Sequence, residues 1–430
     1  MFSHFKLHLL PVEIQSCFFL NLPFYIAKRI SANRKASFSR FIIRLATVAT
    51  ALSVAVMIIA VAVVFGFKET IKDKLFVFWG QIQIAPFNPN PSTIISPAPF
   101  QFSADLKKKI ASEPEVTAVY PFAVKAAILN SGTLMQGVKL KGVDSNYDWS
   151  SNPAITFSGK KPDFKDSSYA HELILSQNIL DKLNKKIGDS LAVWFIDPDQ
   201  EFPRVRKLAI GGTFHTGMAE IDENFSLCDI RLLRRISGWV DNDINGYQVM
   251  IKDYQQSDSV ADRIYKKYLQ APMDRTTMKD LYPNIYNWLD LMNTNAYIIL
   301  FIMAIVAIIN MATALLIFIM ERTNMIGTLK AVGMGNGSLV KIFMYHAANV
   351  AFKGILFGSV FGVGFCLLQQ YTHFIKLDES AYYMQYVPVK LVAWQVLVID
   401  LGTLLICVAS MLLPVLMVKN ISIVKALRFK

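Results

Sequence analysis

Cysteine and charge are both scarce in this sequence. Only four of its 430 residues are cysteine and 18% are charged, whereas about a quarter of an ordinary soluble chain is charged. Only Cys228 falls in the long polar stretch in the middle of the chain, so that stretch cannot form an internal disulfide. The composition therefore excludes a disulfide-stabilised secreted domain. Its high apolar content excludes a disordered chain.

Several functional motifs are also missing. The sequence has no Gly-x-x-x-x-Gly-Lys-[Ser/Thr] loop to hold ATP phosphates and no Gly-x-Ser-x-Gly elbow with a nucleophile and base. The first 23 residues do not form a cleavable signal peptide, because Pro11, Glu13 and Gln15 interrupt any apolar run. We expect a protein that is not an enzyme and binds no cofactor itself.

Apolar residues, in contrast, are abundant and concentrated in four stretches. They make up 53% of the chain. Charge-free runs lie between Arg44 and Lys68, between Asp290 and Glu321, and between Lys353 and Lys376, and a fourth run between Lys390 and Lys419 is interrupted only by Asp400. Each has the roughly 20 residues needed to cross ~30 Å of hydrocarbon. The predicted transmembrane helices are 45–67, 291–320, 341–375 and 391–418. The predicted fold class is a polytopic α-helical membrane protein with four transmembrane helices and a mixed α+β domain between helices 1 and 2.

The net charge of +12 is unevenly distributed. Residues 68–290 contain 27 Lys and Arg and 27 Asp and Glu, and are therefore neutral. The excess positive charge lies in residues 1–44, 321–353 and 419–430. Positive segments near helix ends stay on the cytoplasmic side, so we predict cytoplasmic termini (1–44 and 419–430) and a cytoplasmic 321–340 loop. Residues 68–290 and the short 376–390 loop are then outside. The charge is explained by topology and by anionic lipid headgroups, and nucleic acid is not an expected partner.

The outside domain shows short strand-like runs separated by turns. Helical patterns are predicted at 103–112, 173–187 and 257–269. Strands are predicted at 81–85, 116–120, 126–129, 135–142, 191–196, 207–210 and 247–251. This pattern indicates a mixed α+β domain that binds a partner or transmits force.

One stretch of this domain, 212–225, gathers polar residues that could be taken for a metal site. They are His215, Glu220, Asp222 and Glu223. No second histidine lies nearby at helical or hairpin spacing. We therefore expect a surface loop and no metal, with a metal site as the alternative.

The 321–340 loop contains a short amphipathic helix. Met325, Ile326 and Leu329 form an apolar stripe, and Gly333, Gly335 and Gly337 follow it. Such a helix is typical of a docking element for a soluble partner. The alternative is a helical hairpin at the lipid interface.

Small residues mark two predicted transmembrane helices. Gly354, Gly358 and Gly362 repeat every four residues and share one face, which allows another helix to approach closely. The first helix has small residues on a face of its own, Thr47, Ala51 and Ala55. The glycine face is expected to pack either within this chain or against another subunit.

Asp400 lies about ten residues into the last helix. A carboxylate there costs ~2.5 kcal/mol or more on insertion scales, so it needs a partner or a proton. We expect an interhelical hydrogen bond, for instance with Asn310, and keep proton coupling as the alternative.

The order of these parts resembles that of the permease subunits of lipoprotein-releasing ABC transporters. Their wider group includes the macrolide-export and cell-division permeases, with FtsX-like membrane segments and MacB-like periplasmic domains. The resemblance begins at Tyr25-Ile-Ala-Lys-Arg29 and includes Glu321-Arg-x-x-x-Ile-Gly-x-Leu-Lys-Ala-x-Gly333. The more specific part is 212–225, with Asp229–Trp239 after it.

The resemblance implies a bacterial inner-membrane location with residues 68–290 in the periplasm. It implies an ABC ATPase subunit that binds ATP and Mg, a second permease chain, identical or homologous, and a lipoprotein substrate that enters between the first and second helices. The ATPase-coupling helix would comprise Glu321, Arg322, Ile326, Gly327, Leu329, Lys330, Ala331 and Gly333. The periplasmic motif would comprise Gly212, Phe214, Thr216, Gly217, Glu220 and Asp222. Members that recruit a periplasmic lipoprotein carrier use a long loop, but the matching loop here, Asp197–Pro203, is short.

Two other functions remain open on the sequence. A permease of the same group could export a small molecule or peptide, or regulate the cell envelope. A membrane-anchored sensor or adhesion protein would account for the outside domain but not for the inside helix.

Overall fold

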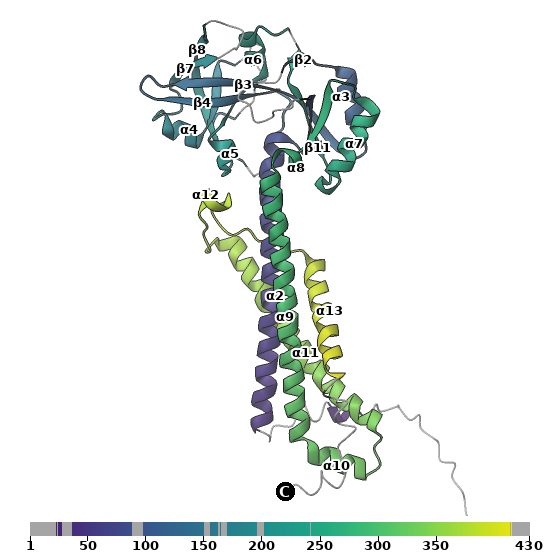
Figure 1. The fold of residues 1–430 in the computed structure, drawn as a ribbon. Coiled ribbons are helices and arrows are strands. Elements are labelled where there is room, and N and C mark those ends of the chain that lie inside the picture. The colour runs from purple at the N-terminus through teal and green to yellow at the C-terminus, as the bar shows by residue number, and fades with distance from the viewer. Residues whose placement is uncertain are drawn as a thin grey trace, which may run out of the picture. The chain divides into compact units, whose positions relative to one another are not determined.

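A computed structural model describes most of the chain, in two units (Figure 1). It describes residues 23, 25–27, 37–87, 98–149, 155–161, 164, 170–195, 202–240, 242–412 and 414, with the backbone alone at 37–40 and 380. The membrane unit comprises Met1–Ala62, Asn295–Leu368 and Lys390–Lys430, and the sheet unit comprises Val63–Thr294 and Gln369–Val389. Most of the basic segment 1–44, the first five residues of the 197–203 loop and the tail 419–430 lie outside the described residues.

Within the described residues, four helices are long and apolar enough to cross a membrane. They are α2 (Ser37–Trp79), α9 (Pro283–Glu321), α11 (Asn336–Thr372) and α13 (Ala393–Ser410). The predicted fold class, four membrane helices with a mixed α/β domain between the first and second, is confirmed. The first three helices extend beyond at least one end of the spans predicted from charge-free runs, because helical hydrogen bonding continues past the apolar segment. Where the chain enters and leaves the membrane stays a prediction.

The sheet unit is built on a ten-stranded mixed sheet in the order β12-β1-β11-β3-β4-β9-β6-β8-β5, with β7 paired to β3 and β8. Its strands are β1 (Ile82–Pro86), β3 (Val116–Asn130), β4 (Met135–Val143), β5 (Thr156–Gly159), β6 (Glu172–Ser176), β7 (Ser190–Phe195), β8 (Arg204–His215), β9 (Phe225–Asp229), β11 (Gly246–Ile251) and β12 (Met273–Thr277). A separate pair joins β2 (Phe100–Gln101) to β10 (Asp243–Ile244).

The unit also contains short helices, most of them next to these strands in the chain, whereas α12 lies between α11 and α13. They are α3 (Ala104–Ala111), α4 (Gln177–Lys182), α5 (Ala219–Asp222), α6 (Ile230–Ser237), the 3-10 turn η1 (Tyr254–Gln256), α7 (Ser257–Tyr268), α8 (Met278–Leu281) and α12 (Glu379–Tyr382). The predicted helices 103–112 and 257–269 match α3 and α7. Ser103 caps α3 by accepting a hydrogen bond from the amide of Leu106.

Two predictions for this domain are wrong. The helix predicted over 173–187 is a strand followed by a helix: β6 pairs in parallel with β8, and Ser176 caps α4. A short apolar run such as Leu173–Leu175 fits a buried strand as well as a helix. The two strands predicted at 116–120 and 126–129 are one strand, β3, which pairs with β11 up to Phe122 and with β4 from Phe122 onward.

Residues 369–389 belong to the sheet unit and are called the strap below. Their ends are joined by the buried side chain of Gln369, which donates to the carbonyls of Ile375 and Val387 and accepts from the amide of Ile375. Met384 is buried in a cluster with Ile71, Leu75 and other apolar residues of α2. The strap, expected only as a short connecting loop at 376–390, is therefore folded into the core of this unit.

Candidate functional site

The helix that the resemblance assigns to ATPase coupling is α10 (Thr323–Ala331). Ile326 and Gly327 are buried, and Met325 and Leu329 pack against the same apolar cluster, which includes residues of α9, α11 and α13. The apolar stripe expected to face a partner is therefore used inside the chain. A partner docking here would meet the other side of α10.

That other side is exposed. The exposed residues of α10 are Asn324, Thr328 and Ala331, and the flanking residues Glu321, Val332 and Gly333 are exposed as well. Val332 is 82% exposed, although it is apolar. Arg322 and Lys330 are half-buried.

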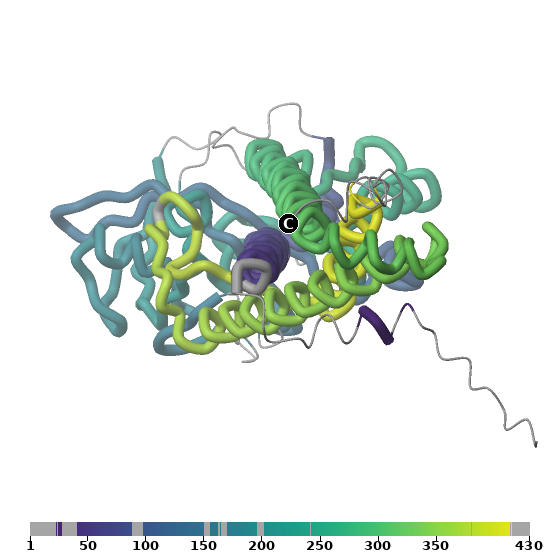
Figure 2. The backbone as a smooth tube through the Cα atoms, turned by 90° about the horizontal axis from the view of Figure 1, so that it is seen from below, coloured from purple at the N-terminus to yellow at the C-terminus, as the bar shows by residue number. Residues whose placement is uncertain are grey.

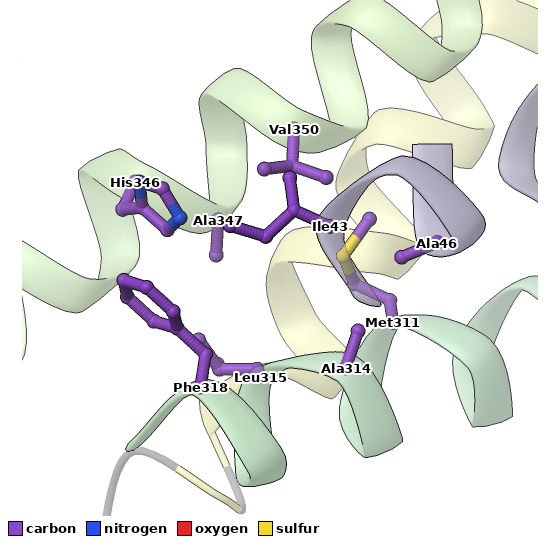
Figure 3. Close-up of a pocket in the computed structure, with 9 residues that line it drawn as sticks. All are labelled: Ile43, Ala46, Met311, Ala314, Leu315, Phe318, His346, Ala347 and Val350. Carbon is purple, nitrogen blue, oxygen red and sulfur yellow. The ribbon is translucent and has the colours of Figure 1, made fainter. Parts of the chain in front are cut away.

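Arg322, which precedes α10, lies over an aromatic ring that stacks on a histidine ring. The Arg322 guanidinium lies 5.8 Å from the centre of the Phe318 ring, and Phe318 stacks on His346 at 4.3 Å between ring centres. Phe318 and His346 also line a cavity of about 20 Å³ between α2, α9 and α11 (Figure 3). This volume matches about one water molecule, so the cavity is too small for an acyl chain.

The glycine face of α11 packs on the small-residue face of α2. A Cβ at Gly354 would lie 2.9 Å from Thr50 Cβ, and one at Gly358 would lie 2.5 Å from the carbonyl oxygen of Ala51. A Cβ at Gly362 would lie 3.1 Å from Ala55 Cα. Figure 2 shows α11 passing beside α2. These glycines therefore allow α11 to pack closely on α2 of the same chain. Packing within the chain was one of the two expectations, and packing against another subunit was the other.

Asp400 has a hydrogen-bond partner on a neighbouring helix, as expected, but the partner is Ser359. The Ser359 hydroxyl donates to Asp400 Oδ1 at 2.7 Å, and no hydrogen bond joins Asp400 to Asn310. Ser359 lies on α11 and Asn310 on α9. Either polar side chain could have paired with Asp400 as far as the sequence shows. The packing of the helices places Ser359 within hydrogen-bond distance.

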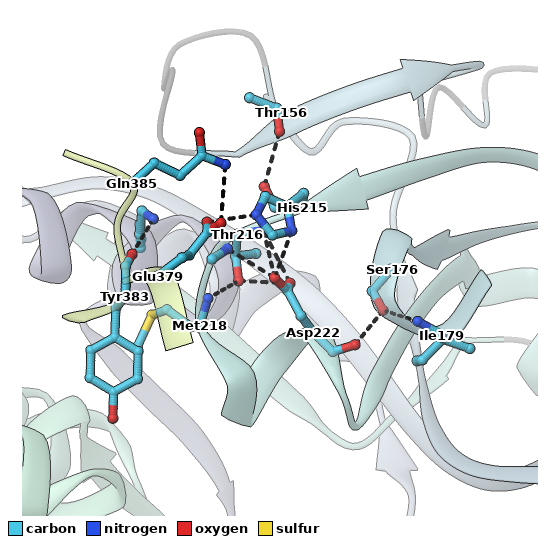
Figure 4. A network of polar contacts seen from close by, with 12 residues as sticks. Thr156, Ser176, Ile179, His215, Thr216, Met218, Asp222, Glu379, Tyr383 and Gln385 are labelled. Atoms are coloured by element: carbon cyan, nitrogen blue, oxygen red, sulfur yellow. Dashed lines mark hydrogen bonds and ion pairs between the residues drawn. The ribbon is translucent and has the colours of Figure 1, made fainter. Parts of the chain in front are cut away.

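In the sheet unit, the 212–225 motif runs from the end of β8 through α5 to the start of β9, and most of it is buried, with Ala219, Glu223 and Asn224 exposed; a surface loop was expected. Asp222 at its centre is 1% exposed. Its carboxylate accepts hydrogen bonds from the amides of Thr216 and Gly217 and from the Thr216 hydroxyl, at 2.8 to 3.1 Å (Figure 4). The Thr216 hydroxyl in turn accepts from the amide of Met218 at 3.0 Å. One carboxylate thus organises the whole turn.

The other motif residues also have defined places. Phe214 is buried against Phe78, with ring centres 6.1 Å apart. Gly212 leaves room for β5, since a Cβ there would overlap the carbonyl of Lys160. Glu220 accepts a hydrogen bond from the Tyr383 hydroxyl at 3.0 Å.

His215 lies between two carboxylates. Its Nε2 is 2.7 Å from Glu379 Oε1, and its Nδ1 is 3.1 Å from Asp222 Oδ2. The contact with Asp222, and then that with Glu379, raises the pKa of His215 to about 9, against the opposing effect of burial. His215 is therefore an imidazolium at neutral pH. Among the described residues, no group of three or more His, Cys, Asp and Glu side chains could hold a metal ion.

The strap reaches the motif through two polar contacts and reaches α2 through a third. Glu379 pairs with His215, the Tyr383 hydroxyl donates to Glu220, and the Tyr383 carbonyl accepts from the ammonium of Lys74 at 2.6 Å. Gly217 fits between these groups, with φ of +72°. A Cβ at Gly217 would lie 2.5 Å from Glu379 Oε1 and 2.7 Å from Lys74 Nζ. Reasoning from the sequence missed Lys74, Glu379 and Tyr383, because no local pattern connects them with the motif.

Lys141 is a further residue that the sequence did not single out. It is fully buried, and its ammonium donates to the carbonyl of Phe78, in the last turn of α2, and to Gln248 Oε1. The rings of Phe78 and Trp79 lie 4.6 Å from it. Burial holds the pKa of Lys141 well below its usual range. The last carbonyls of a helix have no partner within it, so the hydrogen bond from Lys141 to the carbonyl of Phe78 fixes the end of α2.

Comparison with known proteins supports the resemblance drawn from the sequence. Residues 297–423 match the family model described as FtsX-like permease C-terminal. A relative from Haemophilus influenzae, named lipoprotein-releasing system transmembrane protein LolE, is 20% identical over 92% of this chain and 96% of its own length. One from Xylella fastidiosa, named lipoprotein-releasing system transmembrane protein LolC, is 22% identical over 93% of this chain and 97% of its own.

Solved structures of outside domains also show similarity. The periplasmic region of MacB from Actinobacillus actinomycetemcomitans is 14% identical, with a TM-score of 0.33, over 48% of this chain and 92% of that one. The extracellular domain of the ABC-type transporter YknZ from Gram-positive bacteria is 16% identical, with a TM-score of 0.31, over 46% of this chain and 99% of that one.

Proposed function

We propose that this chain is the permease subunit of an ABC transporter that releases lipoproteins from the bacterial inner membrane for transfer toward the outer membrane. The observation that carries the proposal is the match to proteins named LolE and LolC over more than nine tenths of both chains. The match therefore includes the sheet unit and its motif as well as the membrane helices. A sensor or adhesion protein would not require this whole arrangement.

The proposed orientation follows the charge pattern. Both termini and α10 are cytoplasmic, and the sheet unit is periplasmic, because the excess Lys and Arg lies in the short segments next to the helices. A second permease chain, identical or homologous, completes the membrane part. A periplasmic carrier accepts the released lipoprotein.

Energy for release has to come from a separate ATPase. Each acyl CH₂ withdrawn from lipid costs ~0.8 kcal/mol, so an acylated protein does not leave the membrane spontaneously. This chain has no Gly-x-x-x-x-Gly-Lys-[Ser/Thr] loop. We assign ATP and Mg to the partner ATPase and its docking to the exposed side of α10.

The docking surface is tested by substituting Val332. Because Val332 is 82% exposed, Val332→Asp should not disturb folding of this chain. We expect it to abolish co-purification of the ATPase and ATP-dependent release of a lipoprotein from proteoliposomes. The matched control is Val240→Asp, the same change at a 65% exposed valine of the sheet unit, which should behave as the wild type.

The outcomes separate two kinds of error. If Val332→Asp still binds the ATPase and supports release, the docking surface is assigned to the wrong face. If the wild-type complex hydrolyses ATP but releases no lipoprotein to a carrier, the proposed substrate is wrong.

A further inference from the structure

Charged groups contribute to the contact between strap and motif, beside the apolar cluster that Met384 shares with Met218 and Ile221. Glu379 of the strap forms an ion pair with His215 of the motif, and its Oε2 accepts a hydrogen bond from the side-chain amide of Gln385 at 3.0 Å. The groups facing His215 are Asp222 from α5 and Glu379 from α12. The Lys74 ammonium of α2 lies beside Gly217 and interacts electrostatically with both carboxylates. Two positive and two negative groups therefore meet where strap, motif and α2 come together.

The two carboxylates are held very differently. Asp222 is 1% exposed and accepts hydrogen bonds from its own turn, so the motif keeps its shape without the strap. The side chains of Glu379 and His215 are 28% and 29% exposed, and water can replace the contact between them. The contact can therefore open while both the turn and the strap remain folded, which is the property of a two-state element.

We infer that Glu379 and His215 form a latch between strap and motif, and that Glu379 is a positioning residue for lipoprotein release. This inference rests on the proposed function. The latch holds Tyr383 against Lys74 and Glu220, and thereby joins the end of α2 to the segment that connects α11 and α13. When the latch is closed, the strap and the motif are held together. When it opens, the strap can move relative to the motif while Met384 stays packed against α2.

The experiment compares Glu379→Gln, His215→Gln and the double variant in the full complex with its ATPase. The readout is the amount of a triacylated lipoprotein released from proteoliposomes per ATP hydrolysed. Both substitutions keep the side chain able to form hydrogen bonds. Glu379→Gln removes only the ion pair with His215, whereas His215→Gln also removes the contact with Asp222. The matched control is Glu172→Gln, which removes a surface pair with Lys160 (2.9 Å) in the same unit.

We expect each single variant to release about tenfold less lipoprotein per ATP, since a hydrogen bond between charged groups contributes about twice as much as a neutral one. The double variant should be no worse than His215→Gln alone, because the contact between the two residues is already lost in each single variant. ATP turnover and Glu172→Gln should match the wild type.

A pH profile separates positioning from a purely structural role. In the wild type, release per ATP should fall as the pH rises through about 9, where His215 loses its proton. In Glu379→Gln the fall should occur at lower pH, and in His215→Gln this part of the profile should be absent. Other groups of the complex titrate in the same pH range. Their contribution is common to all variants and cancels when the profile of a variant is subtracted from that of the wild type.

The results that would overturn the inference are distinct from those that overturn the proposed function. If the wild type releases lipoprotein and Glu379→Gln releases as much per ATP at every pH, the latch has no role. Additive losses in the double variant would show that the two residues act separately. If the wild type releases no lipoprotein, the proposed function fails and the latch proposal fails with it.

Discussion

Gly217 offers the sharpest test of how the motif and the strap are joined. Its φ of +72° is a conformation that residues with a Cβ adopt at a cost of about 1–2 kcal/mol. Gly188 has φ of +97° in the same unit, but a Cβ there would meet nothing within 4 Å. The two Gly→Ala variants therefore share the backbone cost, and only Gly217→Ala adds a contact.

The added contact falls on the charged groups. With a Cβ 2.5 Å from Glu379 Oε1 and 2.7 Å from Lys74 Nζ, at least one of them has to move away. Loss of a hydrogen bond to a charged group costs about 1.5–3 kcal/mol. We expect Gly188→Ala to lower the free energy of unfolding by about 1–2 kcal/mol and Gly217→Ala by about 3–5 kcal/mol.

Two assays on the full chain in detergent measure this difference. Thermal unfolding ranks the variants, at roughly 2–4 °C per kcal/mol for a unit of this size. NMR titration of labelled histidine, with His215→Gln for assignment, follows the strap directly. The pKa of His215 should be about 9 in the wild type and in Gly188→Ala. In Gly217→Ala it should fall toward 6.5, staying above it because of Asp222. Equal unfolding temperatures and equal pKa values for the two variants would refute the reasoning.

Two other predictions concern pH and helix packing. Because the folded-state pKa of His215 is raised from 6.5 to about 9, its stabilisation of about 3 kcal/mol is complete below pH 6.5. It is lost as the pH rises through 9, so unfolding temperatures of wild type and His215→Gln should converge at high pH; a constant gap would contradict this. Gly358→Leu should destabilise the membrane helices by about 1–3 kcal/mol or more, because a Cβ at Gly358 already lies 2.5 Å from Ala51 O. Gly364→Leu on the same helix has open space and should be neutral in the same thermal assay; equal losses would show that α2 and α11 do not pack through Gly358.

Local features of the fold could be predicted because their causes are local. Apolar length predicts the membrane helices, Ser103 predicts the start of α3, and strand composition predicts β4 and β11. The helix predicted over 173–187 was wrong because its apolar run is short. Such a run fits a helix or a buried strand, and the difference depends on a strand elsewhere in the chain. That strand, β8, begins 28 residues after β6 ends.

The candidate site could be predicted only in part. The motif residues were recognised by resemblance, but Asp222 was expected at a surface, because a carboxylate is rarely buried unless it is fully hydrogen-bonded. Its donors are the backbone amides of its own turn, which exist only once the turn is folded. Likewise, Lys141 reads as an ordinary strand lysine until α2 places the carbonyl of Phe78 beside it.

The amino-acid sequence by itself determined the four apolar stretches, the placement of positive charge, the motif and the small-residue faces at Ala51 and Gly358, since all of these are properties of spacing and composition. Only the tertiary structure decided which faces meet: α11 on α2, Asp400 with Ser359, and Glu379 with His215. The last two residues are 164 positions apart. Contacts at such separation depend on packing and desolvation of the whole unit, which no local pattern of residues contains.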